Sequence, residues 1–206
     1  MTDTKMNWNE YKTLLQLTDR KGIDKLINYL DKNGFSESPC STKYHLNEYG
    51  GLLQHSLNVC RTMERLAEVV APDIPRDSVR ITALLHDIGK IGQHDKPNYI
   101  PNMVRSKSKN KETGEYDKVL STASPFKTNP ELAYIPHEVR SVIIASKFIE
   151  LTEDEEHAIY YHDGKYTHIG YDLKETPLQM LLHFADLWSA KVIEEDGATS
   201  DKEVGD

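Results

Sequence analysis

The sequence predicts an all-α protein, a compact bundle of about seven helices with one irregular inserted loop. Apolar residues recur at intervals of three and four in several separate segments, which is the spacing of one buried helix face. Glycines and prolines divide these segments from one another. A hydrophobic content of 38% over 206 residues is enough for one well-packed core.

The first 47 residues are expected to form a helical extension that packs on the core. Over residues 8–19, the apolar side chains share one helical face. A second helix is expected over residues 23–33, and Gly34 is its stop signal.

The main domain is expected to span residues 48–194 and to begin with a long helix. A strongly periodic apolar pattern covers residues 52–70 and follows directly on the glycine pair at 50 and 51. Pro72 and Pro75 separate this helix from the next helical pattern, which covers residues 79–88.

Residues 92–136 break the helical pattern, because several prolines punctuate them. We interpret this segment as an irregular insertion over the mouth of an active site. Within it, residues 107–115 are expected to form an exposed turn or a short hairpin. The lysine-rich run at 107–118 is then either a solvated loop or a cationic lid that reaches substrate phosphates.

Three further helices are expected after the insertion. The first covers residues 137–149, and Thr152 with Glu155 forms a capping box that starts the second. Thr176 followed by Pro177 marks the start of the third. This last helix is expected to bury Leu178, Leu181, Leu182, Ala185, Trp188 and Val192.

Charge and cysteine content limit the classes of function. The formal charge is −8, which argues against a long nucleic-acid duplex as partner but allows a small phosphorylated substrate. Cys40 and Cys60 form no disulfide framework and fit a reducing compartment. Without an apolar signal segment or an apolar run of roughly 18 residues, the protein is expected in the cytoplasm, with residues 195–206 as an acidic flexible tail.

Histidines and carboxylates interrupt the most apolar helices. His55, the pair His86–Asp87, and Asp186 each lie inside or directly after an apolar run. A buried polar group needs a partner, so these residues form either a hydrogen-bonded pair that supports packing or a metal site. Imidazole with carboxylate suits a divalent transition metal. Lys90 lies within one helical turn of the pair, where it could neutralise a phosphate.

Three motifs resemble, in this order, the H…HD…D signature of HD-domain phosphohydrolases. They are Gly50–His55 (GGLLQH), Leu84–Lys90 (LLHDIGK) and His183–Asp186 (HFAD). Ile135–Ser141 (IPHEVRS) and Ala158–Gly164 (AIYYHDG) are similar to the additional histidine motifs of two-metal members. Those members include cyclic-dinucleotide phosphodiesterases and, with different chemistry, myo-inositol oxygenase. The resemblance implies hydrolysis of a nucleotide, a cyclic nucleotide or a short oligonucleotide.

The resemblance also implies a ligand set for one or two ions of Fe, Mn, Zn, Ni or Co. Asp87 would bridge the two metals and position the nucleophile, and Lys90 would offset the phosphate charge. His162 and Tyr99 are the candidates for a general acid. A di-iron oxygenase with the same ligands and a non-catalytic binding module are the alternatives. The implied ligands are His55, His86, Asp87, His137, His162 and Asp186.

The remaining histidines carry weaker expectations. His183 either supports Asp186 or fills the edge of the core. The others are interpreted as ordinary surface or loop histidines, and they are His45, His94, His157 and His168.

Overall fold

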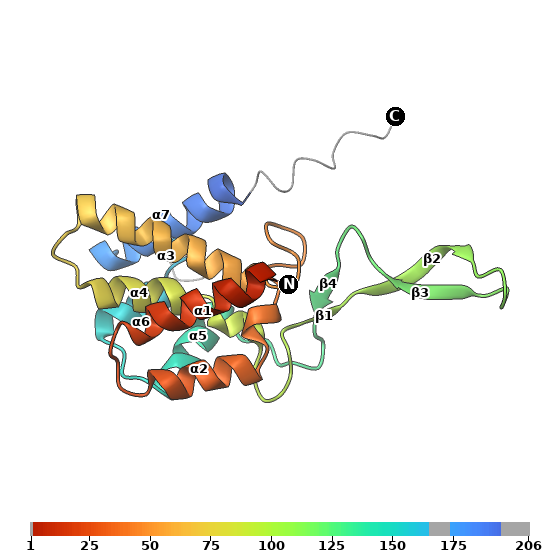
Figure 1. Cartoon of the computed structure of the whole chain (residues 1–206), viewed down its shortest axis with the longest axis horizontal. Coiled ribbons are helices and arrows are strands. Elements are labelled where there is room, and N and C mark those ends of the chain that lie inside the picture. Colours follow the sequence, from red (N-terminus) through yellow and green to blue (C-terminus); the bar gives the residue numbers. More distant parts are fainter. Residues whose placement is uncertain (1, 165–173, 195–206) are drawn as a thin grey trace.

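A computed structural model describes residues 2–164 and 174–194 and confirms the predicted helical fold. Figure 1 shows the helices packed into one body, and their apolar faces share one core. Short helical turns are η1 (Phe35–Glu37), η2 (Ile88–Ile91) and the π-helix η4 (Ser189–Ile193). The α-helices of the described residues are α1 (Thr2–Gln16), α2 (Ile23–Lys32), α3 (Gly51–Val70), α4 (Arg76–Leu85), α5 (His137–Ser146), α6 (Glu153–Tyr160) and α7 (Pro177–Trp188).

The segment 92–136 is more regular than the sequence suggests. It contains two antiparallel strand pairs, and β2 and β3 project from the helical body as an arm (Figure 1). The β1–β4 pair thus forms the base of the insertion, and the β2–β3 hairpin extends away from the helices and does not cover them as a lid. The strands are β1 (Tyr99–Pro101), β2 (Met103–Lys109), β3 (Tyr116–Leu120) and β4 (Phe126–Thr128).

The two N-terminal helices pack on the main body through a buried aromatic cluster. Tyr11 of α1 is fully buried, and its hydroxyl donates a hydrogen bond to the Leu84 carbonyl at 2.8 Å. Its ring lies 4.7 Å from that of Phe35 between ring centroids. Because Leu84 belongs to α4, this hydrogen bond ties α1 to the helix that precedes the His86–Asp87 pair.

Local signals set several helix ends as predicted. Gly34 has a φ of 71°, and the capping box between Thr152 and Glu155 opens α6. Two expectations are wrong. Trp188 and Val192 are 46% and 47% exposed, because helical spacing gives a side chain's direction but not whether another element covers it. The predicted tail and His168 lie outside the described residues.

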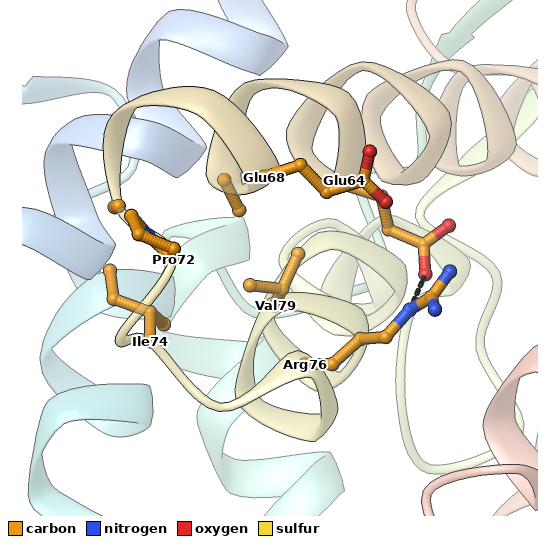
Figure 2. Close-up of a pocket in the computed structure, with 8 residues that line it drawn as sticks. Glu64, Glu68, Pro72, Ile74, Arg76 and Val79 are labelled. Carbon is orange, nitrogen blue, oxygen red and sulfur yellow. Dashed lines mark hydrogen bonds and ion pairs between the residues drawn. The ribbon is translucent and has the colours of Figure 1, made fainter.

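The corner between α3 and α4 is held by ion pairs on the surface. Glu64 accepts hydrogen bonds from Arg76 and Arg80, each at 2.9 Å. Figure 2 shows this corner, where a cavity of about 300 Å³ lies between the end of α3 and the start of α4. None of its lining residues belongs to the predicted metal ligands. No helix in the described part of the chain is both long and apolar enough to cross a membrane.

Candidate metal centre

The structure brings the six predicted ligands together from six different elements. They form overlapping groups whose ligand atoms lie within 4.8 Å of one another. These residues are His55 in α3, His86 at the end of α4, Asp87 at the start of η2, His137 at the start of α5, His162 just after α6, and Asp186 in α7.

The His86–Asp87 pair lies where α4 ends. His86 still has helical backbone angles, but Asp87 has φ −107° and ψ 4°, outside the helical region. The side chains are 0% and 1% exposed. This change of backbone direction lets two neighbouring residues approach one point from different sides, as their position near a helix end predicts.

Gly89 allows α5 to approach this turn closely. Its backbone N–H donates a hydrogen bond to the Ser141 hydroxyl at 2.8 Å. A Cβ atom at Gly89 would clash with the carbonyl oxygen of His137. A glycine at this position therefore permits the close packing that brings His137 to Asp87.

One group of ligand atoms surrounds the Oδ2 side of Asp87. His55 Nε2 lies 3.0 Å from Asp186 Oδ1 and 3.6 Å from Asp87 Oδ2. His86 Nε2 lies 3.3 Å from His55 Nε2 and 3.4 Å from Asp87 Oδ2. Two imidazoles and two carboxylates therefore face one another in a small buried volume.

A second group surrounds the Oδ1 side of Asp87. His137 Nε2 lies 3.2 Å from this oxygen, and His162 Nε2 lies 3.7 Å from it. The two imidazole nitrogens are 3.4 Å apart. Asp163 lies at the edge, with Oδ2 3.9 Å from His137 Nε2. Asp87 thus faces both groups, which is the placement that a bridging carboxylate requires.

Hydrogen bonds on the outer ring nitrogens fix the orientation of the imidazoles. Nδ1 of His86 and of His162 donates to a backbone carbonyl, at 2.8 and 2.7 Å respectively. Nδ1 of His137 faces the Glu138 carboxylate at 3.0 Å. Since these partners can only accept, the neutral rings carry their proton on Nδ1 and point the Nε2 lone pair inward.

On the Oδ1 side of Asp87 the centre is therefore rich in acceptors and poor in donors. Inward-facing nitrogen lone pairs meet carboxylate oxygens, and the buried Oδ1 of Asp87 has no hydrogen-bond partner. Such an arrangement is unfavourable unless a cation occupies it. Mixed nitrogen and oxygen ligands fit a divalent transition metal, so the residues present fit the ion that the sequence predicts.

Lys90 forms a buried ion pair with the central aspartate. Its Nζ lies 2.6 Å from Asp87 Oδ2. Burial raises the pKa of the Asp87 carboxyl, but Lys90 and then His86 outweigh burial and hold it well below its usual range. Burial lowers the pKa of Lys90, and Asp87 more than reverses that effect. Both members are ionised at neutral pH, which is the form needed for metal and phosphate binding.

His55 lies between two carboxylates, one on each ring nitrogen. Burial alone would lower the pKa of its imidazole, but Asp186 and Glu194 contribute to holding it well above its usual value. In the metal-free protein this ring therefore carries an extra proton. His55 would have to lose that proton to serve as a metal ligand, so metal binding would release acid.

Sequence reasoning missed Glu194. Its two carboxylate oxygens accept from His55 Nδ1, both at 3.1 Å, and Asn58 donates to Oε1 at 2.9 Å. Residues eight apart on an α-helix differ by about 80° in direction. The π-helical turn η4 is wider than an α-helical turn, and the Glu194 N–H closes it by donating to the Ser189 carbonyl at 3.0 Å. The wider turn changes that angle, so Glu194 and Asp186 can contact the same imidazole.

Replacing Glu194 by Gln is expected to weaken metal binding on the His55 side by about 10- to 100-fold. The amide keeps the shape but loses the charge that orients the ring and raises its basicity. Competition titration of Mn²⁺ or Zn²⁺ against a chelator measures the change. Glu68→Gln, on the exposed side of α3, is the matched control and should leave the affinity unchanged. An unaltered affinity in Glu194→Gln would show that this carboxylate does not support the ligand.

His45 is not an ordinary surface histidine, which corrects the prediction. Its Nε2 lies 3.6 Å from Glu194 Oε2 and 3.5 Å from the buried Cys40 sulfur. Burial raises the pKa of the Cys40 thiol, so at neutral pH it is a neutral group and a poor metal ligand. Both residues lie in the loop before α3, where no periodic pattern points to the site.

His183 supports His162 and not Asp186, which is the ligand considered from the sequence. Its Nδ1 donates to the backbone carbonyl of His162 at 2.6 Å. Gly164, with φ 67°, allows the close approach, because a Cβ atom there would lie 2.9 Å from the His183 ring. His183 therefore fixes the backbone at His162 rather than the carboxylate of Asp186.

Comparison with known proteins agrees with this geometry. The family model of the HD domain matches residues 52–191, which include all six predicted ligands and Lys90. No curated protein and no solved structure matches the chain. HD domains bind divalent metals through histidine and aspartate, and the described residues contain such clusters. The chain therefore belongs to the HD-domain superfamily of metal-dependent phosphohydrolases.

Proposed function

We propose that this chain hydrolyses a phosphoester of a nucleotide, a cyclic nucleotide or a short oligonucleotide, using one or two divalent transition-metal ions. The observation that carries the proposal is the convergence of imidazole lone pairs and carboxylates on both oxygens of Asp87. When bound, the ions would supply a Lewis acid and an activated water. One would be held by His55, His86, Asp87 and Asp186, and the second by Asp87, His137 and His162.

Lys90 and Tyr99 supply the remaining chemistry in this proposal. The Lys90 ammonium is 15% exposed, so it can bind a phosphate oxygen while remaining paired with Asp87. Burial raises the pKa of the Tyr99 phenol, and the nearby charge of Lys90 offsets only part of that rise. Tyr99 thus keeps a proton that it can give to the leaving oxygen. His162 is less suited as the acid, because its Nδ1 donates to a backbone carbonyl and its Nε2 faces Asp87.

His137→Ala is expected to lower the metal content from two ions to one per chain. The substitution removes one of the two imidazoles on the Oδ1 side of Asp87 and leaves the Oδ2 side complete. Elemental analysis after reconstitution with Mn²⁺ or Fe²⁺ measures the ratio. His94→Ala, in an exposed turn, is the control. A variant that still holds two ions, or a reconstituted wild type that never exceeds one, would contradict the two-metal arrangement.

A substrate screen tests the function itself. Freshly purified protein is assayed with phosphomonoesters, phosphodiesters and nucleotides in the presence of Mn, Fe, Co, Ni or Mg. Metal-dependent release of phosphate or nucleotide supports the hydrolase. Bound iron with oxygen consumption but no phosphoester cleavage would instead favour the oxygenase. Nucleotide binding without turnover under every metal would favour a non-catalytic module.

A further inference from the structure

The β2–β3 hairpin forms an exposed arm that none of the site chemistry uses. We call residues 103–120 the arm. It projects from the helical body (Figure 1), and nearly all of its residues are exposed. A hairpin of two strands is only marginally stable by itself in water. An arm of this length therefore raises the question of what contacts it.

One face of the arm is basic, although the chain carries a net charge of −8. Arg105 and Lys118 lie directly opposite each other across the strands, and Lys109 lies opposite Tyr116. The Arg105 guanidinium lies 3.5 Å from the centre of the Tyr116 ring, and the Lys109 ammonium lies 5.8 Å from it. These four residues share one face, and we call them the basic face. Lys107 lies in the irregular stretch between Arg105 and Lys109.

The contacts with the Tyr116 ring favour the hairpin, but the pairing of Arg105 with Lys118 does not. Like charges directly opposite on paired strands are destabilising. Among the described residues, no carboxylate forms an ion pair with Arg105, Lys107, Lys109 or Lys118. The one carboxylate within β3, Asp117, accepts instead from Asn110 at 3.1 Å. Several cations on one face without a carboxylate partner indicate a polyanionic ligand.

The root of the arm is fixed beside the metal centre. β1 begins at Tyr99, whose phenol lies in the electrostatic field of Lys90 and Asp87. In β4, Phe126 is 3% exposed and packs edge-on against Tyr49, with ring centroids 4.9 Å apart. The Ser124 hydroxyl donates to the Thr42 carbonyl at 2.8 Å. A strand bound along the arm would therefore lead toward the centre.

We propose that the basic face binds the phosphate backbone of a single-stranded oligonucleotide. Arg105, Lys109 and Lys118 supply cations for several phosphates. The stacked pair of Arg105 and Tyr116 offers a flat surface on which a base can stack. The acidic body disfavours a long duplex, which would contact more than one narrow arm. The turn carries Glu112 and Glu115 and no large apolar side chain, so it is unsuited to membrane insertion. That the bound strand is also the substrate rests on the function proposed above.

Fluorescence anisotropy with a labelled 12-nucleotide oligo-dT tests the binding. The full chain as purified is used without added metal, and a denaturing gel verifies that the oligonucleotide stays intact. The arm variant combines Arg105→Gln, Lys107→Gln, Lys109→Gln and Lys118→Gln. The control variant makes the same charge change on exposed residues of α1, α2 and their connection, with Lys5→Gln, Lys21→Gln, Lys25→Gln and Lys32→Gln.

The wild type is expected to bind with an affinity that falls steeply with salt, since each phosphate contact on a single strand contributes a slope of about −0.7. The arm variant should bind at least about tenfold more weakly at low salt, and the control variant within about twofold. No binding by the wild type, or equal losses in both variants, would overturn the proposal. So would arm-dependent binding to vesicles containing phosphatidylserine without binding to oligo-dT.

A turnover measurement separates this proposal from the hydrolase function. The arm variant should raise the KM for oligo-dT and leave kcat for bis-p-nitrophenyl phosphate unchanged, because that substrate is too small to reach the arm. A chain that binds oligo-dT through the arm but hydrolyses nothing would sink the hydrolase and leave the binding face standing. Hydrolysis of both substrates without any effect of the arm variant would support the hydrolase function and overturn the proposed role of the arm.

Discussion

Replacing Asp87 by Asn is expected to lower metal-dependent hydrolysis by on the order of a thousand-fold, about 4 kcal/mol of transition-state stabilisation. Both carboxylate oxygens face imidazole nitrogens where the ions would bind, so the amide removes the negative charge and replaces one of these oxygens by an NH2 group that cannot ligate a metal. Metal content, measured by elemental analysis, should fall in parallel with activity.

The matched control is Asp73→Asn, which makes the same chemical change in the exposed α3–α4 connection. It should retain full metal content and rate. Removing the Asp87 charge also leaves Lys90 buried without its partner, so circular dichroism must first show a folded variant. If it does not fold, Asp186→Asn replaces it, because that ligand is 18% exposed and, within residues 2–164 and 174–194, forms no ion pair with a lysine. Near-normal hydrolysis by a folded variant would exclude Asp87 as the central ligand.

Elements defined by local signals could be predicted from the sequence. The capping box at Thr152 and the Thr176–Pro177 start each satisfy a helix end with residues three positions apart, so no distant contact decides them. Gly34 ends its helix for the same reason. The His86–Asp87 pair was also recognisable, because a polar pair directly after buried leucines requires a partner wherever the rest of the chain lies.

The assembly of the centre could not be derived from such signals. His137 and His162 follow ordinary helix boundaries, and only the family resemblance placed them with Asp87. Glu194 carries no motif, and its direction depends on a π-helical turn that a period of 3.6 residues does not anticipate. His45 lies in a loop whose course depends on packing against α3.

The hairpin alternative predicted for residues 107–115 is confirmed, but the full length of the arm was not predicted, because most of its strand residues form no apolar face. From Arg105 onward β2 alternates cations with serines, whereas the usual strand pattern alternates apolar with polar residues. Trp188 and Val192 show the opposite failure, since their spacing suits a buried face but no described element covers them. In both cases the tertiary environment, rather than the local pattern, decides the outcome.

A second buried carboxylate supports the fold at a distance from the metal centre. Glu155 of α6 is fully buried and forms two hydrogen bonds with the Arg20 guanidinium, at 2.8 and 2.9 Å. It accepts from the Ser78 hydroxyl at 2.8 Å and from the Thr152 backbone N–H at 2.9 Å. One side chain thus joins the α1–α2 connection, α4 and the start of α6.

Glu155→Ala is expected to lower the free energy of unfolding by about 3 kcal/mol at pH 7, because it leaves the Arg20 guanidinium and the cap of α6 without their acceptor. Urea unfolding of the metal-free protein measures the change. Glu156→Ala, one residue further along and exposed, is the control and should change stability by less than about 0.5 kcal/mol. Equal stability of the two variants would show that the buried pair contributes nothing to the fold.

The pH dependence gives this prediction a second, independent readout. Burial raises the pKa of the Glu155 carboxyl, but its hydrogen bonds, first that from Arg20, outweigh burial and hold the pKa below its usual 4.5. A lowered pKa means that the stabilisation is present above pH 4.5 and is lost as the pH falls through the lower folded-state value. The stability difference between wild type and Glu155→Ala should therefore be largest near neutrality and shrink below about pH 4. The Asp87→Asn variant should instead lose metal and rate at pH 7, which separates a residue that holds the ion from one that holds the helices together.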